Sequence, residues 1–321
     1  MTEPEKNQPA DKHRLVYING DFISQPKAGV SVRDKGLVYG DSVFDTARTF
    51  NGKLFRLDAH IERLYRSLAL TQLDAGLTPA EMASATEELL DRNMPLLRDG
   101  EDYWVTQRVS SGLQQLDGEI LDYSGPTVII DCIPIPLRAR ALSFRDGIDA
   151  AIPDRKRIAP EALSPNIKSN NYLNLTLAQR EVQKLYPGAW ALMCDPNGNI
   201  AEGAGCNYFL VKDNTVYTPT DTYILPGVSR QVVLEICASL NIDIQVADVT
   251  PQQALDADEA FFTSTSLCVC PLRSLNGSIY GSVVPGPVTK RIMDAFCDLV
   301  GFDYVAQYLS FINESDGSTG L

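Results

Sequence analysis

The chain has 321 residues, of which 44% are hydrophobic, and its formal net charge at pH 7 is -13. This length and composition predict a globular protein with a sizeable core that divides into two domains. Because the negative charge repels nucleic acids and anionic lipids, we expect neither as a partner.

The N-terminal segment and the cysteines indicate where the protein resides. Residues 1–13 are polar, so we expect disorder there and no secretory signal. No uncharged apolar run approaches the length needed to cross a bilayer. The seven cysteines lack the even spacing of a disulfide framework, which predicts reduced cysteines and a cytoplasmic protein. Cys268 and Cys270 are expected in a buried strand rather than a metal site, because no second Cys or His cluster accompanies them.

Residues 1–132 are predicted to form an N-terminal α+β domain. The pair Asn19-Gly20 lies between two alternating apolar stretches and favours a type I′ hairpin. One helix is predicted to begin at Asp58 as its N-cap, and a second begins at Thr78, which forms a capping-box pattern with Glu81. The segments YWVTQRVSS and GPTVIIDCIPIP follow as strands.

The prolines of CIPIPLRARA predict an interdomain linker at residues 133–142, and residues 143–321 form the second domain. There, the strands AWALMCD, NYFLVKD and TVYTP alternate with helices around 172–186, 229–240 and 286–300. This mixture predicts an α/β fold of the α+β type. The C-terminal NESDGSTGL is expected to be frayed.

Two charged residues of the second domain are candidates for chemistry. Lys168 lies in a polar, turn-rich approach to a helix, where an amine at the edge of a pocket could form a Schiff base with a carbonyl cofactor. The alternative is a solvated surface lysine. Glu202 lies between a turn and a Gly-Ala-Gly stretch that permits close backbone approach, and its alternative is a solvated glutamate on a hairpin.

Two further segments are suited to binding an anion or lining a site. Gly227-Val228-Ser229 directly precedes an amphipathic helix, whose exposed amides and positive end would suit a phosphate. Alternatively, Ser229 only caps that helix. The hydroxyl run in FFTSTSLCVCPL either lines a site or ends a strand.

These segments, taken in order, resemble a known family. The order RLDAHIERL, IKSNNYLN, NIAEGAGCNYFLVKD, ILPGVSR, FFTSTS and GPVTKRI is similar to that of the class IV, or fold type IV, pyridoxal-phosphate enzymes, from about residue 15 to 300. The family includes branched-chain, D-amino acid and (R)-amine transaminases and aminodeoxychorismate lyases. The resemblance implies a smaller N-terminal and a larger C-terminal domain with pyridoxal 5′-phosphate between them, and a homodimer.

The resemblance also assigns roles to individual positions. Lys168 matches the lysine that forms the aldimine with the cofactor and carries the proton in the 1,3-shift, and Glu202 matches the carboxylate facing the pyridine nitrogen. The other cofactor-binding matches are Arg63 in HIERL and Thr265 in TSTS for the phosphate, Val228 and Ser229 at the helix start, and Tyr172 near the cofactor O3′.

The predicted substrate pocket departs from the branched-chain pattern. Trp104 and Thr106 occupy the positions of a family Tyr-x-Arg, so the arginine that organises the substrate carboxylate is missing. Alternation along the strand puts Arg108 on the same face, where it either replaces that charge or is a paired surface arginine. Pocket-lining positions are also matched by Tyr39 and Phe44, for which core packing is the alternative, and we include Ser266 in the pocket.

The resulting prediction is a transaminase that moves an amino group from a hydrophobic or branched-chain amino acid, or a primary amine, to a 2-oxo acid. The alternatives are an (R)-amine or D-amino acid transaminase, an aminodeoxychorismate-type lyase, and a non-catalytic binding protein that has kept the fold.

Overall fold

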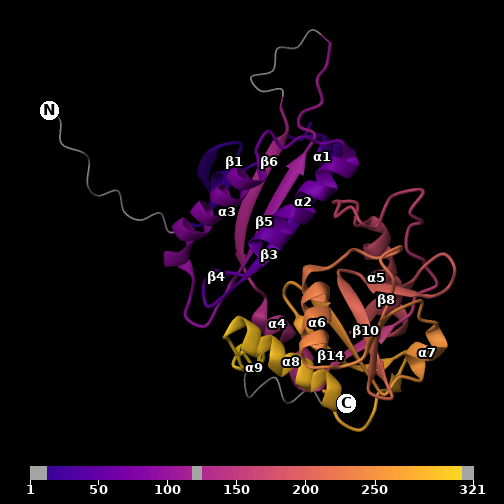
Figure 1. Ribbon diagram of the computed structural model, residues 1–321. Coiled ribbons are helices and arrows are strands. Elements are labelled where there is room, and N and C mark those ends of the chain that lie inside the picture. Colours follow the sequence, from indigo (N-terminus) through magenta and orange to yellow (C-terminus); the bar gives the residue numbers. More distant parts are fainter. Residues whose placement is uncertain (1–12, 118–124, 313–321) are drawn as a thin grey trace. The chain divides into compact units, whose positions relative to one another are not determined.

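The computed structural model describes residues 13–117 and 125–312, and the chain divides into two compact units, Met1–Pro134 and Ile135–Leu321 (Figure 1). The predictions of disorder at residues 1–13 and of a frayed tail from residue 313 lie, apart from His13, outside the described residues. The expected linker at 133–142 contains the end of strand β6 (Thr127–Pro134) and the start of helix α4 (Leu137–Asp146). Its prolines end the strand and precede the helix, positions where a missing N–H is tolerated.

The first unit contains a six-stranded antiparallel sheet in the order β2-β1-β6-β5-β3-β4. Besides β6, its strands are β1 (Leu15–Ile18), β2 (Asp21–Ser24), β3 (Ser42–Phe50), β4 (Lys53–Leu54) and β5 (Tyr103–Ser110). The predicted hairpin joins β1 to β2, and its turn residues Asn19 and Gly20 both have positive φ, 48° and 103°.

Two long helices cover one face of this sheet, α2 (Leu57–Thr71) and α3 (Pro79–Asn93). The short elements are η1 (Gln25–Lys27), α1 (Lys35–Val38) and η2 (Met94–Leu96). The capping box predicted at Thr78 is present, since its side chain accepts from the Glu81 N–H while Glu81 accepts from Thr78. The N-cap predicted at Asp58 is wrong, because the N-cap is Arg56 in a left-handed conformation and Asp58 lies in the first turn.

The second unit is built around a nine-stranded sheet that closes on itself. Strand β9 (Ile200–Gly203) pairs with both β8 (Trp190–Cys194) and β10 (Cys206–Lys212), so β10-β13-β14-β7-β8-β9 forms a ring. The remaining strands are β7 (Ile148–Ala151), β11 (Thr215–Thr218), β12 (Ile244–Val246), β13 (Glu259–Ser264), β14 (Cys268–Leu275) and β15 (Ser278–Ile279). The prediction that Cys268 and Cys270 lie in a buried strand is confirmed.

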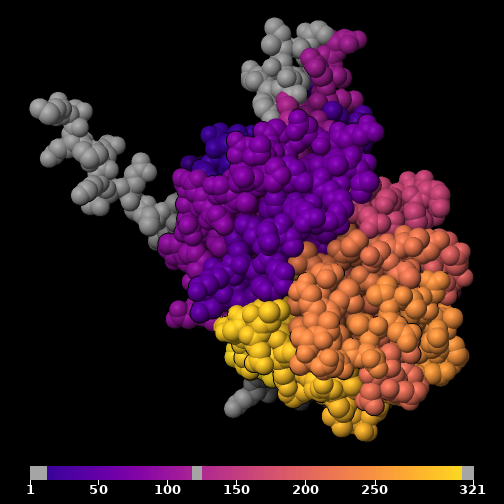
Figure 2. Space-filling model, viewed as in Figure 1, coloured from indigo at the N-terminus to yellow at the C-terminus, as the bar shows by residue number. Residues whose placement is uncertain are grey.

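Helices pack around the ring of the second unit. They are α4, α5 (Leu173–Leu185), α6 (Val228–Ser239), α7 (Pro251–Leu255), α8 (Pro287–Val300) and α9 (Tyr304–Leu309). α5 packs on β8, while α6 and α8 pack on β13 and on each other. In the space-filling view, the yellow surface of the C-terminal helices adjoins the orange surface of this unit (Figure 2). Within the described ranges, no helix is long and apolar enough to cross a membrane.

Candidate active site

Glu202 lies on β9, the short strand that closes the ring, and only 5% of it is exposed. Its cross-strand neighbour Asn207 donates from Nδ2 to Oε2 of Glu202 at 3.3 Å. The backbone N–H of Leu225 donates to the same oxygen at 3.1 Å, and Nη2 of Arg157 lies 2.9 Å from Oε1. The alternative of a solvated glutamate is therefore wrong.

The charge of Lys168 acts on the Glu202 carboxyl. Burial raises the pKa of the Glu202 carboxyl, while Arg157, the Leu225 amide and the Lys168 charge act to lower it. Lys168 lies in the loop between β7 and α5 and is half-buried, so it is not a fully solvated surface lysine. A lysine amine thus lies within electrostatic reach of a buried carboxylate in the second unit.

Tyr172 ends the Lys168 loop as the N-cap residue of α5, and it is half-buried. Its side chain makes no capping hydrogen bond, so helix capping does not explain a tyrosine at this position. Its backbone N–H donates to the carbonyl of Asn170 at 2.8 Å, which keeps the approach to α5 tight.

The start of α6 lies beside Asn207. A Cβ added to Gly227, the N-cap of α6, would lie 2.0 Å from Oδ1 of Asn207, so only glycine lets the helix begin this close. Gly227 has no side chain with which to cap this end, so the first amides of the helix, those of Val228 and Ser229, are suited to an anion. Ser229 is the second residue of the helix, so the alternative that it caps α6 is wrong.

The end of β13, which pairs with β10, places hydroxyl groups beside Asn207. Thr263 pairs with Asn207 across the ladder, and its buried Oγ1 has no hydrogen-bond partner among the described residues. Thr265 follows the strand and is half-buried, whereas Ser266 is 4% exposed and accepts a hydrogen bond from Arg140. An unpaired buried hydroxyl beside Asn207 indicates that the protein alone does not complete this site.

Arg63 lies in the first unit, on α2, where Asp45 of β3 holds it. Nε of Arg63 donates to Oδ2 of Asp45 and Nη2 donates to Oδ1, both at 2.8 Å, and His60 Nδ1 lies 2.7 Å from Oδ1. All three residues are buried. Burial acts to raise the pKa of Asp45, but Arg63 and His60 outweigh it and hold the pKa well below its usual range. The guanidinium of Arg63 is therefore fixed in orientation by a carboxylate.

Trp104, Thr106 and Arg108 alternate along β5 and share a face of the first sheet, as predicted. Thr106 forms a hydrogen bond with Thr46 at 3.0 Å. Arg108 forms an ion pair with Asp131 of β6, so its charge is already compensated within the sheet. Arg63 is not brought to this face, since its partner Asp45 points to the helix-covered side.

The two other predicted pocket residues of the first unit differ in burial. Tyr39, just after α1, is 60% exposed, which excludes core packing as its role within this unit. Phe44 is half-buried and faces Arg108 across the β3–β5 ladder, so it lies on the Trp104 face.

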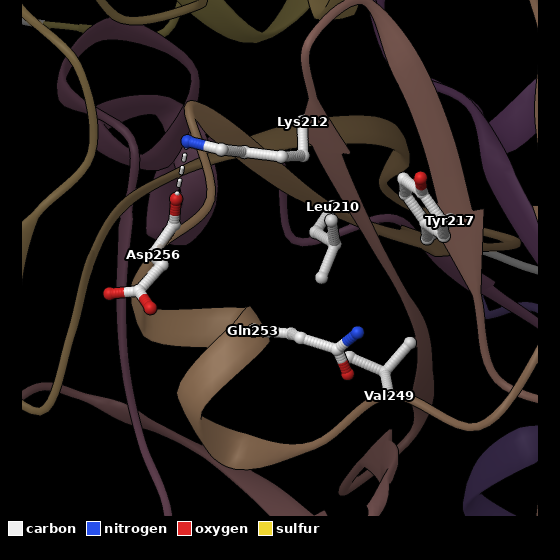
Figure 3. Close-up of a pocket in the computed structure, with 6 residues that line it drawn as sticks. All are labelled: Leu210, Lys212, Tyr217, Val249, Gln253 and Asp256. Atoms are coloured by element: carbon white, nitrogen blue, oxygen red, sulfur yellow. Dashed lines mark hydrogen bonds between the residues drawn. The ribbon is translucent and has the colours of Figure 1, made fainter.

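A separate cavity of about 190 Å³ lies at the far end of β10 (Figure 3). Its lining residues are Leu210, Lys212, Tyr217, Val249, Gln253 and Asp256. The Lys212 ammonium donates to the Asp256 carbonyl at 3.0 Å, and Gln253 completes the capping box of α7. Because these polar groups satisfy one another, the cavity does not compete with Glu202 and Lys168 as the candidate site.

Several known proteins are similar to this chain over most of its length. The model of the family "Amino-transferase class IV" matches residues 42–275. A putative branched-chain-amino-acid aminotransferase of Methanocaldococcus jannaschii is 34% identical, covering 88% of this chain and 96% of that protein. A D-alanine aminotransferase of Bacillus licheniformis is 32% identical, covering 87% and 95%. An aminodeoxychorismate lyase of Bacillus subtilis is 31% identical, covering 84% and 89%.

A solved structure shares the fold. The T.th. branched-chain amino acid aminotransferase with pyridoxamine 5′-phosphate superposes with a TM-score of 0.80 at 28% identity, covering 90% of this chain and 94% of that one. The chain therefore belongs to the class IV aminotransferase family. The predicted resemblance, the two-domain fold type IV architecture and the class of enzyme, a pyridoxal-phosphate-dependent aminotransferase, are confirmed.

Sequence patterns did not single out three residues that hold the candidate groups. Asn207 lies across a tight turn from Glu202, and the Gly-Ala-Gly stretch was a signal for that hairpin. Arg157 lies in a short basic run that looks like a solvated segment, and Asp45 contacts Arg63 only through the packing of α2 on β3. For these two residues, nothing in the local sequence indicated the partner.

Proposed function

We propose that the Lys168 and Glu202 site carries pyridoxal 5′-phosphate and performs transamination, with Lys168 as the catalytic residue. When bound, the cofactor supplies a ring that accepts the electrons left on the donor Cα after proton loss. Lys168 takes that proton and returns it at the cofactor C4′. The observation that supports this scheme is Glu202, a buried carboxylate held by three donors and within electrostatic reach of Lys168.

The residues present fit the phosphate and the ring of such a cofactor. The start of α6, with the amides of Val228 and Ser229, suits a phosphate dianion, and the half-buried Thr265 would add a hydroxyl. Glu202 would keep the ring nitrogen protonated. Tyr172 beside O3′ and Arg63 as a phosphate ligand follow from the family match, and the ion pair with Asp45 supports Arg63 as a pre-oriented donor.

The proposed donor is a hydrophobic or branched-chain amino acid or a primary amine, and the acceptor is a 2-oxo acid. The branched-chain names of several relatives support this class. On this face Trp104 and Phe44 offer apolar surface, and Thr106 stands where the family has an arginine. Because Asp131 compensates the charge of Arg108, this arginine does not select for a donor with a second carboxylate.

Three alternatives differ in what they predict. A D-amino acid or (R)-amine transaminase is supported by the D-alanine aminotransferase relative, and would respond only to donors of that configuration. A lyase is supported by the aminodeoxychorismate lyase relative, and would release pyruvate from aminodeoxychorismate. A non-catalytic binding protein would be purified without cofactor, and the retention of both Lys168 and Glu202 counts against it.

A half-reaction decides among them. The purified holoenzyme is titrated separately with L-leucine, D-alanine and (R)-1-phenylethylamine, and the long-wavelength absorbance of the bound cofactor is followed. The proposal predicts loss of the band with L-leucine. Loss only with D-alanine or only with the amine would assign the alternative donor class, and no loss with any donor would contradict transamination of these substrates.

We also propose that the protein acts as a homodimer. The segment around α1 exposes large apolar side chains, among them Val32 at 79%, Leu37 at 66% and Tyr39 at 60%. Several exposed apolar side chains in one segment support a protein interface. Analytical ultracentrifugation should give twice the monomer mass, and Val32→Asp with Leu37→Asp should shift it towards the monomer. A monomeric native protein would contradict the proposal.

A cytoplasmic location is proposed on the state of the thiols. All seven cysteines are free and six of them are buried, which supports a protein adapted to a reducing compartment. Fractionation of the native cells should find the protein with cytoplasmic markers, and recovery from an extracytoplasmic fraction would contradict this.

A further inference from the structure

Arg157 is held in place more firmly than a loop arginine usually is. Its backbone N–H donates to the carbonyl of Cys194, at the end of β8, at 2.9 Å. Only 10% of its side chain is exposed, and Nη2 lies 2.9 Å from Oε1 of Glu202. Ordering a long side chain and desolvating an ion pair both cost free energy. Stability alone therefore gives little reason for this pair.

The hydrogen bonds to Glu202 leave one acceptor position available, on Oε1. A carboxylate offers about two acceptor positions on each oxygen. Leu225 and Asn207 occupy those of Oε2, whereas Arg157 is the one donor to Oε1 within the described parts of the chain. A further donor would therefore approach Oε1, beside Arg157.

We propose that Arg157 is a positioning residue that keeps Glu202 ionised and directs Oε1 to the N–H of the cofactor ring. This inference rests on the proposed function, because it concerns the same carboxylate. It assigns Arg157 a part in the reaction without contact with the substrate.

The charges explain why such a residue is needed. With the cofactor bound, Glu202 would face the ring nitrogen, and the ring would accept electrons when the proton between them lies on the nitrogen. Arg157 contacts the carboxylate directly, so its positive charge stabilises the arrangement with the negative charge on Glu202. Burial is the larger influence and leaves the pKa of Glu202 raised, and Arg157 is the largest of the influences that lower it. Without Arg157, the proton would move towards the carboxylate.

The test uses the holoenzyme reconstituted with ¹⁵N-labelled pyridoxal phosphate, with the Arg157→Gln variant compared with wild type. The ¹⁵N chemical shift of the ring reports protonation of the nitrogen independently of turnover. We expect a protonated nitrogen at pH 7.5 in wild type and a shift towards the unprotonated value in Arg157→Gln. The kcat should fall roughly 10- to 100-fold, the range of one charge-assisted hydrogen bond, with KM changing less.

A matched control lies two positions earlier in the same loop. Arg155 is 43% exposed and contacts Glu181 at 3.7 Å, so Arg155→Gln removes the same charge without touching Glu202. It should keep the wild-type ¹⁵N shift and kcat. Arg157→Lys should restore part of the shift, since it returns the charge with fewer donors. In a Glu202→Gln background, Arg157→Gln should add little, because Arg157 acts through that carboxylate.

The outcomes separate the two proposals. If wild type binds no cofactor, the proposed function fails. If wild type binds the cofactor but Arg157→Gln keeps its ¹⁵N shift and kcat, only the role of Arg157 is overturned. Should Arg157→Gln fail to fold, the ¹⁵N shift of the Arg157→Lys holoenzyme carries the test. A wild-type shift in that variant would overturn the inference, and a partial move towards the unprotonated value would support it.

Discussion

Replacing Gly227 by alanine should disturb both the start of α6 and the carboxylate of the candidate site. The new Cβ would lie 2.0 Å from Oδ1 of Asn207, roughly 1.5 Å closer than non-bonded atoms normally pack. Asn207 must then move, which breaks its hydrogen bonds to the Leu225 carbonyl at 2.9 Å and to Glu202 at 3.3 Å. Adding one methyl group at Gly227 therefore also disturbs the Glu202 carboxylate.

The magnitude follows from these contacts. Each lost hydrogen bond is worth about 1 kcal/mol, and forced overpacking costs about 1–3 kcal/mol. The free energy of unfolding of Gly227→Ala should therefore fall by about 3–5 kcal/mol, lowering Tm by roughly 6–20 °C for a unit of this size. Because the helix start also shifts, the cofactor should dissociate faster.

The assay is thermal unfolding followed by circular dichroism, with cofactor absorbance measured before and after gel filtration. Gly29→Ala is the control, since no atom lies within 4 Å of its added Cβ and its φ is not in the left-handed region. It should change stability by less than about 0.5 kcal/mol. Wild-type Tm and full cofactor retention in Gly227→Ala would refute the argument that this glycine sets the approach of α6 to Asn207.

Other substitutions test separate parts of the account. Lys168→Ala should abolish turnover while leaving cofactor binding measurable by equilibrium dialysis, whereas Arg63→Ala should mainly raise the cofactor Kd; normal turnover by Lys168→Ala would rule out the scheme. Because the pKa of Asp45 is lower in the folded protein, its ionised carboxylate stabilises the fold above the unfolded pKa near 4. This stabilisation is lost as the pH falls through the lower folded pKa. Asp45→Asn should cost about 3–5 kcal/mol at pH 7 and flatten the acid limb of urea-unfolding stability against pH; an unchanged limb would contradict this. Thr78→Ala should cost about 1 kcal/mol in the same assay, and a neutral result would mean that the capping box contributes nothing.

Local sequence rules predicted the elements that local forces determine. The Asn19-Gly20 turn, the Thr78 capping box and the helices α5, α6 and α8 followed from turn chemistry and periodicity within a few residues. The start of α2 was missed by a short distance, because Arg56 adopts a left-handed conformation that no capping preference for Asp58 reveals. The sequence also did not predict that β9 closes the ring, because closure depends on the pairing of this short strand with both β8 and β10.

The candidate site divides in the same way. Lys168, Glu202 and the α6 start were predicted because ordered motifs resemble a family. The burial of Glu202 and the position of Ser229 inside α6 remove the alternatives of a solvated glutamate and a simple cap. The groups that hold them were not found, because Arg157 and Asp45 act across distances in sequence that no local pattern encodes. The substrate pocket depends most on such contacts, as the pairing of Arg108 with Asp131 illustrates.

The central claim is that Lys168 holds the cofactor, and reductive trapping tests it most directly. The purified holoenzyme is treated with sodium borohydride, digested and analysed by mass spectrometry for a phosphopyridoxyl group on lysine. The account predicts the modification on the peptide that contains Lys168, with loss of activity in proportion to labelling. Labelling of another lysine, or none in a protein that retains bound cofactor, would contradict it.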